Sequence, residues 1–133
     1  MISETRPPTI LCVDDECTGL LMRRKILETQ GYRVFTAENG RAGIAIVSAE
    51  AIDLVLLDYM MPDEDGGIVA KKIRGMKPAI PILMLSAVVD LPPEVLAHID
   101  RHVVKGQSPL GLLSAVAELL NSGSTFSDTG AAG

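Results

Sequence analysis

The feature of this sequence that most constrains its fold is a run of four branched aliphatic residues at positions 54–57, which ends directly at Asp58. The run is too short for a buried helix, and the turn residues behind it, Pro62 and Asp65-Gly66, show where it stops. It therefore predicts a central strand that is buried on both faces. Ligands of open parallel α/β sheets bind at the carboxyl ends of the strands, so we expect Asp58 to lie where chemistry takes place.

Strand-like and helix-like segments alternate along the rest of the chain. Strands are predicted at residues 9–13, 32–36, 54–57, 80–85 and 102–104, and helices at 18–30, 39–50, 67–74, 92–99 and 108–120. This alternation predicts an α/β fold with a single doubly wound sheet of five parallel strands, right-handed crossovers and helices on both faces. The domain is expected to span residues 9–121, with a flexible arm at 1–8 and a disordered tail or linker at 122–133.

The polar and apolar positions of the helical segments indicate how they face the sheet. Asn39 and Ser108 are expected to cap the second and fifth helices. The apolar face of the fifth helix is predicted at Leu110, Leu113, Val116, Ala117 and Leu120. On the third helix, the side exposed to water is predicted at Lys71, Lys72 and Arg74.

The composition argues against several classes of protein. The 133 residues suffice for one domain with a hydrophobic core. A net charge of −5 and an aromatic content of 3% argue against direct nucleic-acid binding, which uses basic surfaces and stacking side chains. Because no run of about 18 apolar residues and no apolar leader is present, we expect a cytoplasmic chain without membrane segments.

Polar side chains follow four of the five predicted strands. Asp14 and Asp15 follow the first strand, Asp58 the third, Ser86 the fourth and Lys105 the fifth. Because the carboxyl ends of parallel strands share one edge of a sheet, residues far apart in the sequence are expected to converge there. The sequence therefore predicts one shallow site built from three carboxylates, a hydroxyl and an amine.

Carboxylates held this close repel each other, and one of them would normally keep a proton. Lys105 and a divalent metal ion can both relieve the repulsion. Carboxylate oxygens suit Mg²⁺, which commonly bridges carboxylates to a phosphate, and the chain offers no His/Cys cluster for zinc. With the hydroxyl of Ser86, this set predicts phosphoryl chemistry in which Asp58 attacks phosphorus and carries the group as an acyl phosphate.

Each of these residues also has an ordinary structural interpretation. An aspartate after a strand usually forms a turn or caps a helix, and for Asp15 taken alone we favour that interpretation. A single serine or lysine at the start of a loop is usually only solvated. Four suitable residues at four strand ends are harder to explain in this way, so we favour the functional interpretation.

Five segments of the chain resemble the receiver domain of two-component response regulators. They are Ile10-Leu11-Cys12-Val13-Asp14-Asp15-Glu16, Leu56-Leu57-Asp58-Tyr59-Met60-Met61-Pro62, Asp65-Gly66, Ser86-Ala87 and Val103-Val104-Lys105. The resemblance covers about residues 9–120 and implies a flavodoxin-like fold with strand order 2-1-3-4-5. It also implies a signalling phosphoacceptor and not an enzyme, with at most self-phosphorylation from small donors and slow autodephosphorylation.

The resemblance implies a role for each residue of the site. Asp58 matches the phosphoacceptor, which takes its phosphoryl group from a histidine kinase or a histidine phosphotransfer protein. Asp14 and Asp15, together with Asp58 and the backbone carbonyl of Met60, match the residues that hold Mg²⁺. Lys105 matches the lysine that accompanies the phosphoacceptor.

Ser86 and His102 correspond to the two switch positions of the family. Phosphorylation is expected to draw Ser86 toward the phosphate and the side chain at position 102 inward. The surface of the fourth helix, fifth strand and fifth helix would then change for an unidentified effector or for a homodimer. His102 replaces the usual Tyr or Phe, so it either keeps this motion, adds pH sensitivity, weakens the switch or has no role. The fourth helix is expected to be short or irregular, because the interval from Ser86 to Lys105 is about one helical turn short.

Three other interpretations stay open. A degenerate receiver would act as a docking module without a normal phosphorylation switch. An aspartyl-nucleophile phosphohydrolase would share the carboxylates, metal and lysine, but generally has an Asp-x-Asp motif after the first strand, where this chain has Asp14-Asp15. A flavin or dinucleotide binder would share the fold, but no G-x-G-x-x-G motif follows the first strand. No output domain is visible, so the sequence fits a stand-alone regulator or part of a larger protein.

Overall fold

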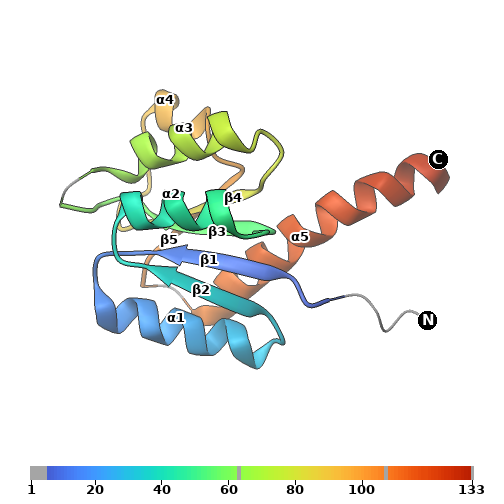
Figure 1. Cartoon of the computed structure of the whole chain (residues 1–133), viewed down its shortest axis with the longest axis horizontal. Coiled ribbons are helices and arrows are strands. Elements are labelled where there is room, and N and C mark those ends of the chain that lie inside the picture. The colour runs from blue at the N-terminus through green and yellow to red at the C-terminus, as the bar shows by residue number, and fades with distance from the viewer. Residues whose placement is uncertain (1–5, 63, 107, 133) are drawn as a thin grey trace.

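The computed structural model of the chain describes residues 6–62, 64–106 and 108–132, with side chains described through Asn121. Within these residues, strands and helices alternate along the chain (Figure 1). The strands are β1 (Thr9–Val13), β2 (Arg33–Ala37), β3 (Leu54–Asp58), β4 (Ile82–Ser86) and β5 (Arg101–Val104). The helices are α1 (Cys17–Thr29), α2 (Gly40–Ala49), α3 (Gly66–Met76), α4 (Pro93–Leu96) and α5 (Pro109–Ala132).

The strands form one parallel sheet in the order β2-β1-β3-β4-β5, which confirms the predicted doubly wound α/β fold and its strand order. As the aliphatic run predicted, β3 is central and all of its residues are buried. Its side chains alternate between two cores, because successive residues of a strand point to opposite faces. Val55 and Leu57 pack with α2, α3 and α4, whereas Leu54 and Leu56 pack with α1 and α5.

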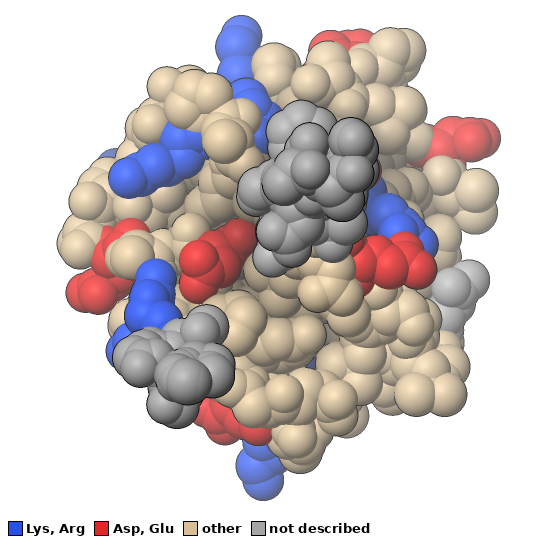
Figure 2. Space-filling model, turned by 90° about the vertical axis from the view of Figure 1, so that its right-hand side faces the viewer, with Lys and Arg blue, Asp and Glu red and all other residues tan. Residues whose placement is uncertain are grey.

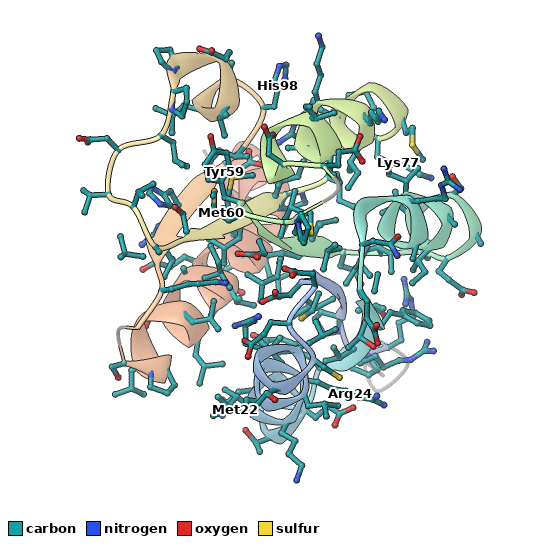
Figure 3. All side chains as sticks on the ribbon, turned by 90° about the vertical axis from the view of Figure 1, so that its left-hand side faces the viewer. Met22, Arg24, Tyr59, Met60, Lys77 and His98 are labelled. Carbon is teal, nitrogen blue, oxygen red and sulfur yellow. The ribbon has the colours of Figure 1, made fainter. Side chains whose placement is uncertain are left out.

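Parallel strands give the sheet two chemically different edges. The carboxyl ends of the strands lie on the left in Figure 1 and face the viewer in Figure 3, and we call this side the carboxyl edge. The opposite side, which faces the viewer in Figure 2, is called the amino edge. On the amino edge, acidic and basic side chains are interspersed (Figure 2).

Side-chain caps fix the start of α2 and α3. Asn39 accepts a hydrogen bond from the backbone N–H of Ala42 at 2.8 Å, which confirms the predicted cap. Asp65 accepts one from the N–H of Ile68 at 3.0 Å. Such caps contribute about 1 kcal/mol each. Because α3 follows the loop after Asp58, the second cap also holds that loop in place.

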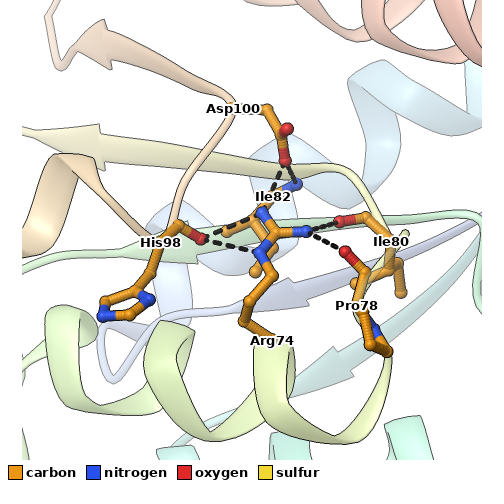
Figure 4. A network of polar contacts seen from close by, with 6 residues as sticks. All are labelled: Arg74, Pro78, Ile80, Ile82, His98 and Asp100. Atoms are coloured by element: carbon orange, nitrogen blue, oxygen red, sulfur yellow. Dashed lines mark hydrogen bonds and ion pairs between the residues drawn. The ribbon is translucent and has the colours of Figure 1, made fainter.

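The helix α4 has only four residues, which confirms the short fourth helix. Its Val95 is buried against α3 at Gly67, where an added Cβ would lie only 2.8 Å from Val95 Cγ2. The chain beyond α4 is held by Arg74 of α3, which donates to the carbonyl of His98 and to the carboxylate of Asp100 (Figure 4). The guanidinium of Arg74 thus satisfies the carbonyl of His98, which lies beyond the end of α4. The helix ends at Leu96, earlier than the predicted end at residue 99.

Two predictions about helix faces were wrong in part. On α5, Val116 is buried as predicted and Leu113 and Leu120 pack against the core, but Leu110 is 72% exposed, and Leu112 and Ala115 are buried in its place. The buried stripe is rotated because α5 packs against β3 and β5, and this packing decides which side faces the core. Arg74, expected in water, has a side chain only 23% exposed, because backbone carbonyls of two loops surround it.

The helix α5 continues to Ala132, beyond Asn121, where the predicted domain ends. No proline interrupts residues 110–132, so nothing in this stretch prevents the helix from continuing. The division into an arm at 1–8, a domain at 9–121 and a tail or linker at 122–133 stays a prediction. In the described part of the chain, no helix is both long and apolar enough to cross a membrane.

Candidate functional site

Three carboxylates meet at the carboxyl edge. The register of β1 and β3 places Val13 beside Leu57, so the residues that follow them in the chain are neighbours as well. Asp14, Asp15 and Asp58 each offer one oxygen, and these oxygens lie within 4.8 Å of one another. The structure thus brings together the acidic residues that the strand ends predicted.

The three carboxylates differ in their exposure to water. Asp14 is 1% exposed and Asp58 is 2% exposed, whereas Asp15 is an exposed residue. A buried carboxylate is costly unless cations or hydrogen-bond donors surround it. The site therefore depends on its positive partners.

Lys105 is the predicted cation, and it reaches both buried carboxylates. Its Nζ lies 2.8 Å from Asp58 Oδ1 and 3.7 Å from Asp14 Oδ2. The backbone N–H of Lys105 donates to the carbonyl of Ser86 at 2.8 Å, which continues the pairing of β4 with β5 beyond the strands themselves. The amine is thus positioned by the sheet and not only by its own side chain.

Arg23 is a second cation of the site, and the sequence analysis missed it. Its guanidinium forms an ion pair with Asp14 Oδ2, and its side chain is 16% exposed. The available signal was helical spacing, because Arg23 follows Leu20 by three residues and precedes Leu27 by four. Both leucines are buried, so an arginine between them on the same face of α1 points toward the sheet.

The protonation of Asp58 reflects these opposing influences. Burial raises the pKa of the Asp58 carboxyl above its ordinary value, the contact with Lys105 lowers it, and the charge of Asp14 raises it again. The net effect is a raised pKa, which marks a carboxylate whose negative charge is incompletely compensated. Perturbed acids of this kind gather at functional sites.

The loop after Asp58 is drawn tightly against β3. The N–H of Tyr59 donates to the carbonyl of Leu85 at 2.9 Å, and the N–H of Gly66 donates to the carbonyl of Tyr59 at 2.7 Å. Gly66 is required here because an added Cβ would lie 2.5 Å from the carbonyl oxygen of Asp58. Met60 lies in this loop at the carboxyl edge, with its side chain extending into solvent (Figure 3).

Ser86 is fully buried at the end of β4. Its hydroxyl accepts a hydrogen bond from the N–H of Val88 at 3.0 Å and lies 3.2 Å from the Val88 carbonyl, to which it can donate. In this arrangement the hydroxyl holds the start of the β4–α4 loop. Any contact with a group on Asp58 would require it to exchange partners.

His102 lies on the edge strand β5, in register with Met84 of β4. Its Nε2 atom is buried and has no hydrogen-bond partner among the described residues. A buried polar atom without a partner costs about 1–3 kcal/mol. Packing of the strand therefore holds the imidazole in a position where its Nε2 atom makes no hydrogen bond.

The set of donors fits a hard divalent cation. Its potential ligands are carboxylate oxygens, and the cluster contains neither histidine nor cysteine. The thiol of Cys12, two residues before Asp14, is buried, and burial raises its pKa to about 12, so it stays protonated. Three carboxylates against the two cations Lys105 and Arg23 leave an excess of negative charge, which Mg²⁺ can balance.

Known proteins similar to this chain include regulators and a sensor. The chain is 38% identical over 129 residues to the transcriptional regulatory protein ResD of Bacillus subtilis (strain 168), which covers 95% of the chain and 53% of ResD. It is 39% identical over 88 residues to the sensor protein GacS of Pseudomonas syringae pv. syringae, which covers 62% of the chain and 10% of GacS. The chain thus spans about half the length of ResD and about a tenth of GacS.

Solved structures of response regulators superpose on most of this chain. A response regulator receiver domain protein (CheY-like) from Methanospirillum hungatei JF-1 superposes with a TM-score of 0.81 at 28% identity, over 87% of this chain and 95% of that one. The response regulator protein TrrA from Thermotoga maritima, in complex with Mg(2+)-BeF, superposes with a TM-score of 0.78 at 34% identity, over 84% of this chain and 98% of that one. The sequence profile of the response regulator receiver domain matches residues 10–117. This chain therefore belongs to the receiver domain family of two-component response regulators.

Proposed function

We propose that Asp58 is the phosphoacceptor of this receiver domain. One observation carries the proposal: a buried carboxylate with a raised pKa ends the central strand, 2.8 Å from the amine of Lys105 and among two further carboxylates. The donor is proposed to be a phosphohistidine of a histidine kinase or of a histidine phosphotransfer protein. The names of the relatives support a signalling role but do not identify the donor.

The transfer follows from the chemistry of the residues at the carboxyl edge. One oxygen of Asp58 forms a bond to phosphorus, the phosphorus–nitrogen bond to the donor imidazole breaks, and the electron pair of that bond returns to the imidazole. The ammonium group of Lys105 offsets the negative charge of the buried Asp58 carboxylate. Tyr59 and Gly66 keep the loop behind the nucleophile from moving away during the attack.

Asp14, Asp15 and Asp58 are proposed to hold Mg²⁺ together with the backbone carbonyl of Met60. The clustered carboxylate oxygens support this assignment, and the solved structure of TrrA contains Mg(2+)-BeF. When bound, Mg²⁺ would withdraw charge from the oxygens of the transferring group. The carboxylates would hold the ion in place, and the ion would offset the negative charge that Lys105 and Arg23 leave uncompensated.

Ser86 and His102 are proposed to carry the signal away from the site. A phosphoryl group on Asp58 offers acceptor oxygens that compete with Val88 for the hydroxyl of Ser86. Release of Val88 frees the β4–α4 loop, and His102 on the neighbouring strand can then repack. The result is a population shift at the surface of α4, β5 and α5.

The recipient of the signal is proposed to be an effector domain or protein that reads the surface of α4, β5 and α5. ResD is named a transcriptional regulatory protein and GacS a sensor protein, so similar receivers belong to proteins with different outputs. A homodimer through the same surface remains part of the proposal. Direct contact of this domain with nucleic acid or a membrane is not proposed, given its net charge of −5.

Intact-mass measurement after incubation with Mg²⁺ and acetyl phosphate tests the phosphoacceptor. We expect one added phosphoryl group, no adduct in Asp58→Asn and none in the presence of a chelator. Asp53→Asn is the matched control, because Asp53 precedes the same strand at the amino edge, and it should be phosphorylated like the wild type. An adduct that survives in Asp58→Asn would contradict the assignment, and steady release of phosphate from esters would favour a phosphohydrolase.

A further inference from the structure

We propose that Arg23 competes with the divalent metal ion for Asp14. In this view, Arg23 is a built-in counter-ion that stabilises the carboxyl edge without metal and weakens metal binding. It would thus set the Mg²⁺ concentration at which the domain becomes ready for phosphorylation. The inference rests on the proposed metal site and concerns a residue outside the set of ligands.

Both oxygens of Asp14 are engaged before any metal binds. Oδ1 accepts a hydrogen bond from the backbone N–H of Glu16 at 2.9 Å. Oδ2 forms the ion pair with Arg23 and lies 3.7 Å from Lys105 Nζ. A metal ion that uses Asp14 must therefore share Oδ1 with the Glu16 N–H, share Oδ2 with the guanidinium, or displace one of these partners, and in each case it meets the positive charge of Arg23 beside the same carboxylate.

The local sequence of α1 makes room for this contact. A Cβ added at Gly19 would lie 2.9 Å from Glu16 Oε1 and 3.3 and 3.4 Å from the two terminal nitrogens of Arg23. The space that a side chain at position 19 would fill is thus occupied by the ends of Glu16 and Arg23. The glycine and the arginine act as a pair, because the first opens the path that the second follows to Asp14.

The next residue in the chain shows what an ordinary arginine does on this helix. Arg24 has a side chain 45% exposed and pairs with Glu28 one turn further along, on the surface of α1 (Figure 3). Arg23 has a side chain 16% exposed and pairs with a carboxylate that is 2% exposed. Pairs on the surface contribute little, whereas partners of a buried carboxylate change its energy strongly.

Removal of Arg23 changes the charge that a metal ion encounters. With Arg23 and Lys105 in contact, the three carboxylates keep one uncompensated negative charge, and without Arg23 they keep two. In the absence of Arg23, the two uncompensated negative charges of the carboxylates equal the charge of a divalent cation, and Oδ2 of Asp14 no longer contacts a guanidinium. The same change leaves the metal-free site with more repulsion between carboxylates.

Isothermal titration of Mg²⁺ into wild type and Arg23→Gln tests the competition. Loss of one charge-assisted contact corresponds to about a tenfold change in affinity, so we expect the dissociation constant of Arg23→Gln to fall about tenfold. Thermal unfolding should show a lower melting temperature for Arg23→Gln without metal and a larger rise on addition of Mg²⁺. Arg24→Gln is the matched control, since it removes the same charge from the same helix, and it should leave the affinity unchanged.

Gly19→Leu provides a second route that keeps the charge of the domain. The new side chain occupies the path of the guanidinium, so Mg²⁺ affinity should rise in this variant as well. An unchanged or weaker affinity in folded Arg23→Gln, with normal binding in wild type, would overturn this inference and leave the proposed function intact. Absence of Mg²⁺ binding in wild type and in both variants would overturn the proposed metal site itself, and this inference with it.

Discussion

The two edges of the sheet each contain a group of partly or fully buried charges, and the groups are built in opposite ways. At the amino edge, Arg74 donates to the carbonyls of Pro78 and Ile80 at 3.0 and 2.6 Å, to His98 at 2.9 and 3.3 Å, and to Asp100 at 2.7 Å (Figure 4). Every nitrogen of its guanidinium has an acceptor, and a single carboxylate balances its charge.

At the carboxyl edge, the balance is left incomplete. Three carboxylates share two cations, and the pKa of Asp58 is raised because burial and Asp14 outweigh the effect of Lys105. At the amino edge, all donors of the Arg74 guanidinium already have acceptors, so we call this group saturated, and it serves to hold loops in place. The unsaturated group at the carboxyl edge can still gain a metal ion or a phosphoryl group, and this difference separates a structural cluster from a functional one.

The largest effect on stability is expected at the amino edge. Arg74→Met removes the donors of several loop carbonyls and leaves Asp100 with one backbone partner, the N–H of Ile82. We expect the free energy of unfolding in urea to fall by about 3 kcal/mol. Lys72→Met on the same helix breaks only the surface pair with Glu64 and should cost less than about 1 kcal/mol. Equal losses in the two variants would remove the distinction between a saturated cluster and an ordinary surface pair.

A smaller effect, of opposite sign, is expected at the carboxyl edge. The raised pKa of Asp58 means that the folded state binds this proton more tightly than the unfolded chain does. The ionised carboxylate therefore reduces stability as the pH rises from its ordinary pKa, near 3.8, toward the raised value. Asp58→Asn should be more stable than wild type at neutral pH, and this gain should shrink as the pH falls toward 4.

Urea unfolding across this pH range measures the difference. Asp53→Asn, at the other end of β3, should show no gain at neutral pH, because its carboxylate instead accepts from the N–H of Thr9 at 2.7 Å. A gain in Asp58→Asn that persists unchanged at low pH would show that ionisation is not its cause.

The smallest effect concerns communication between the edges. The five residues of β3 span roughly 16 Å at about 3.3 Å per residue, so the Arg74 group and the Asp58 group lie well apart. The residues that contact Arg74 are not among those that contact Asp58. The double variant Arg74→Met/Asp58→Asn should show additive changes in unfolding free energy, within about 0.5 kcal/mol. Thermal shifts caused by Mg²⁺ should likewise be similar in wild type and Arg74→Met. A coupling above about 1 kcal/mol would show that the sheet transmits strain from one edge to the other.

The sequence predicted the carboxyl edge well because its geometry follows from a simple rule. Because β3 ends in Asp58, β4 ends in Ser86 and Lys105 follows β5, a parallel sheet brings these residues to one edge. The aliphatic run of β3 identified the centre of that sheet without any long-range information.

The two arginines escaped prediction because their contacts depend on how separate elements of the chain pack together. Arg74 lies on the polar side of its helix, and only the folded loops bring the carbonyls of Ile80 and His98 back to it. For Arg23, helical spacing indicates only that the side chain faces the sheet, whereas its contact with Asp14 also uses the space that Gly19 leaves open. Local periodicity therefore predicts elements and strand ends, but not which long side chain bridges them.

The hydrogen bond from the Lys105 N–H to the carbonyl of Ser86 has a mechanical consequence. It joins the residue that carries the amine to the residue that carries the hydroxyl, so neither backbone segment moves without pulling the other. A rearrangement at one of these strand ends is then one collective step with a single rate constant. Relaxation-dispersion measurements on the two amides would accordingly report the same exchange rate.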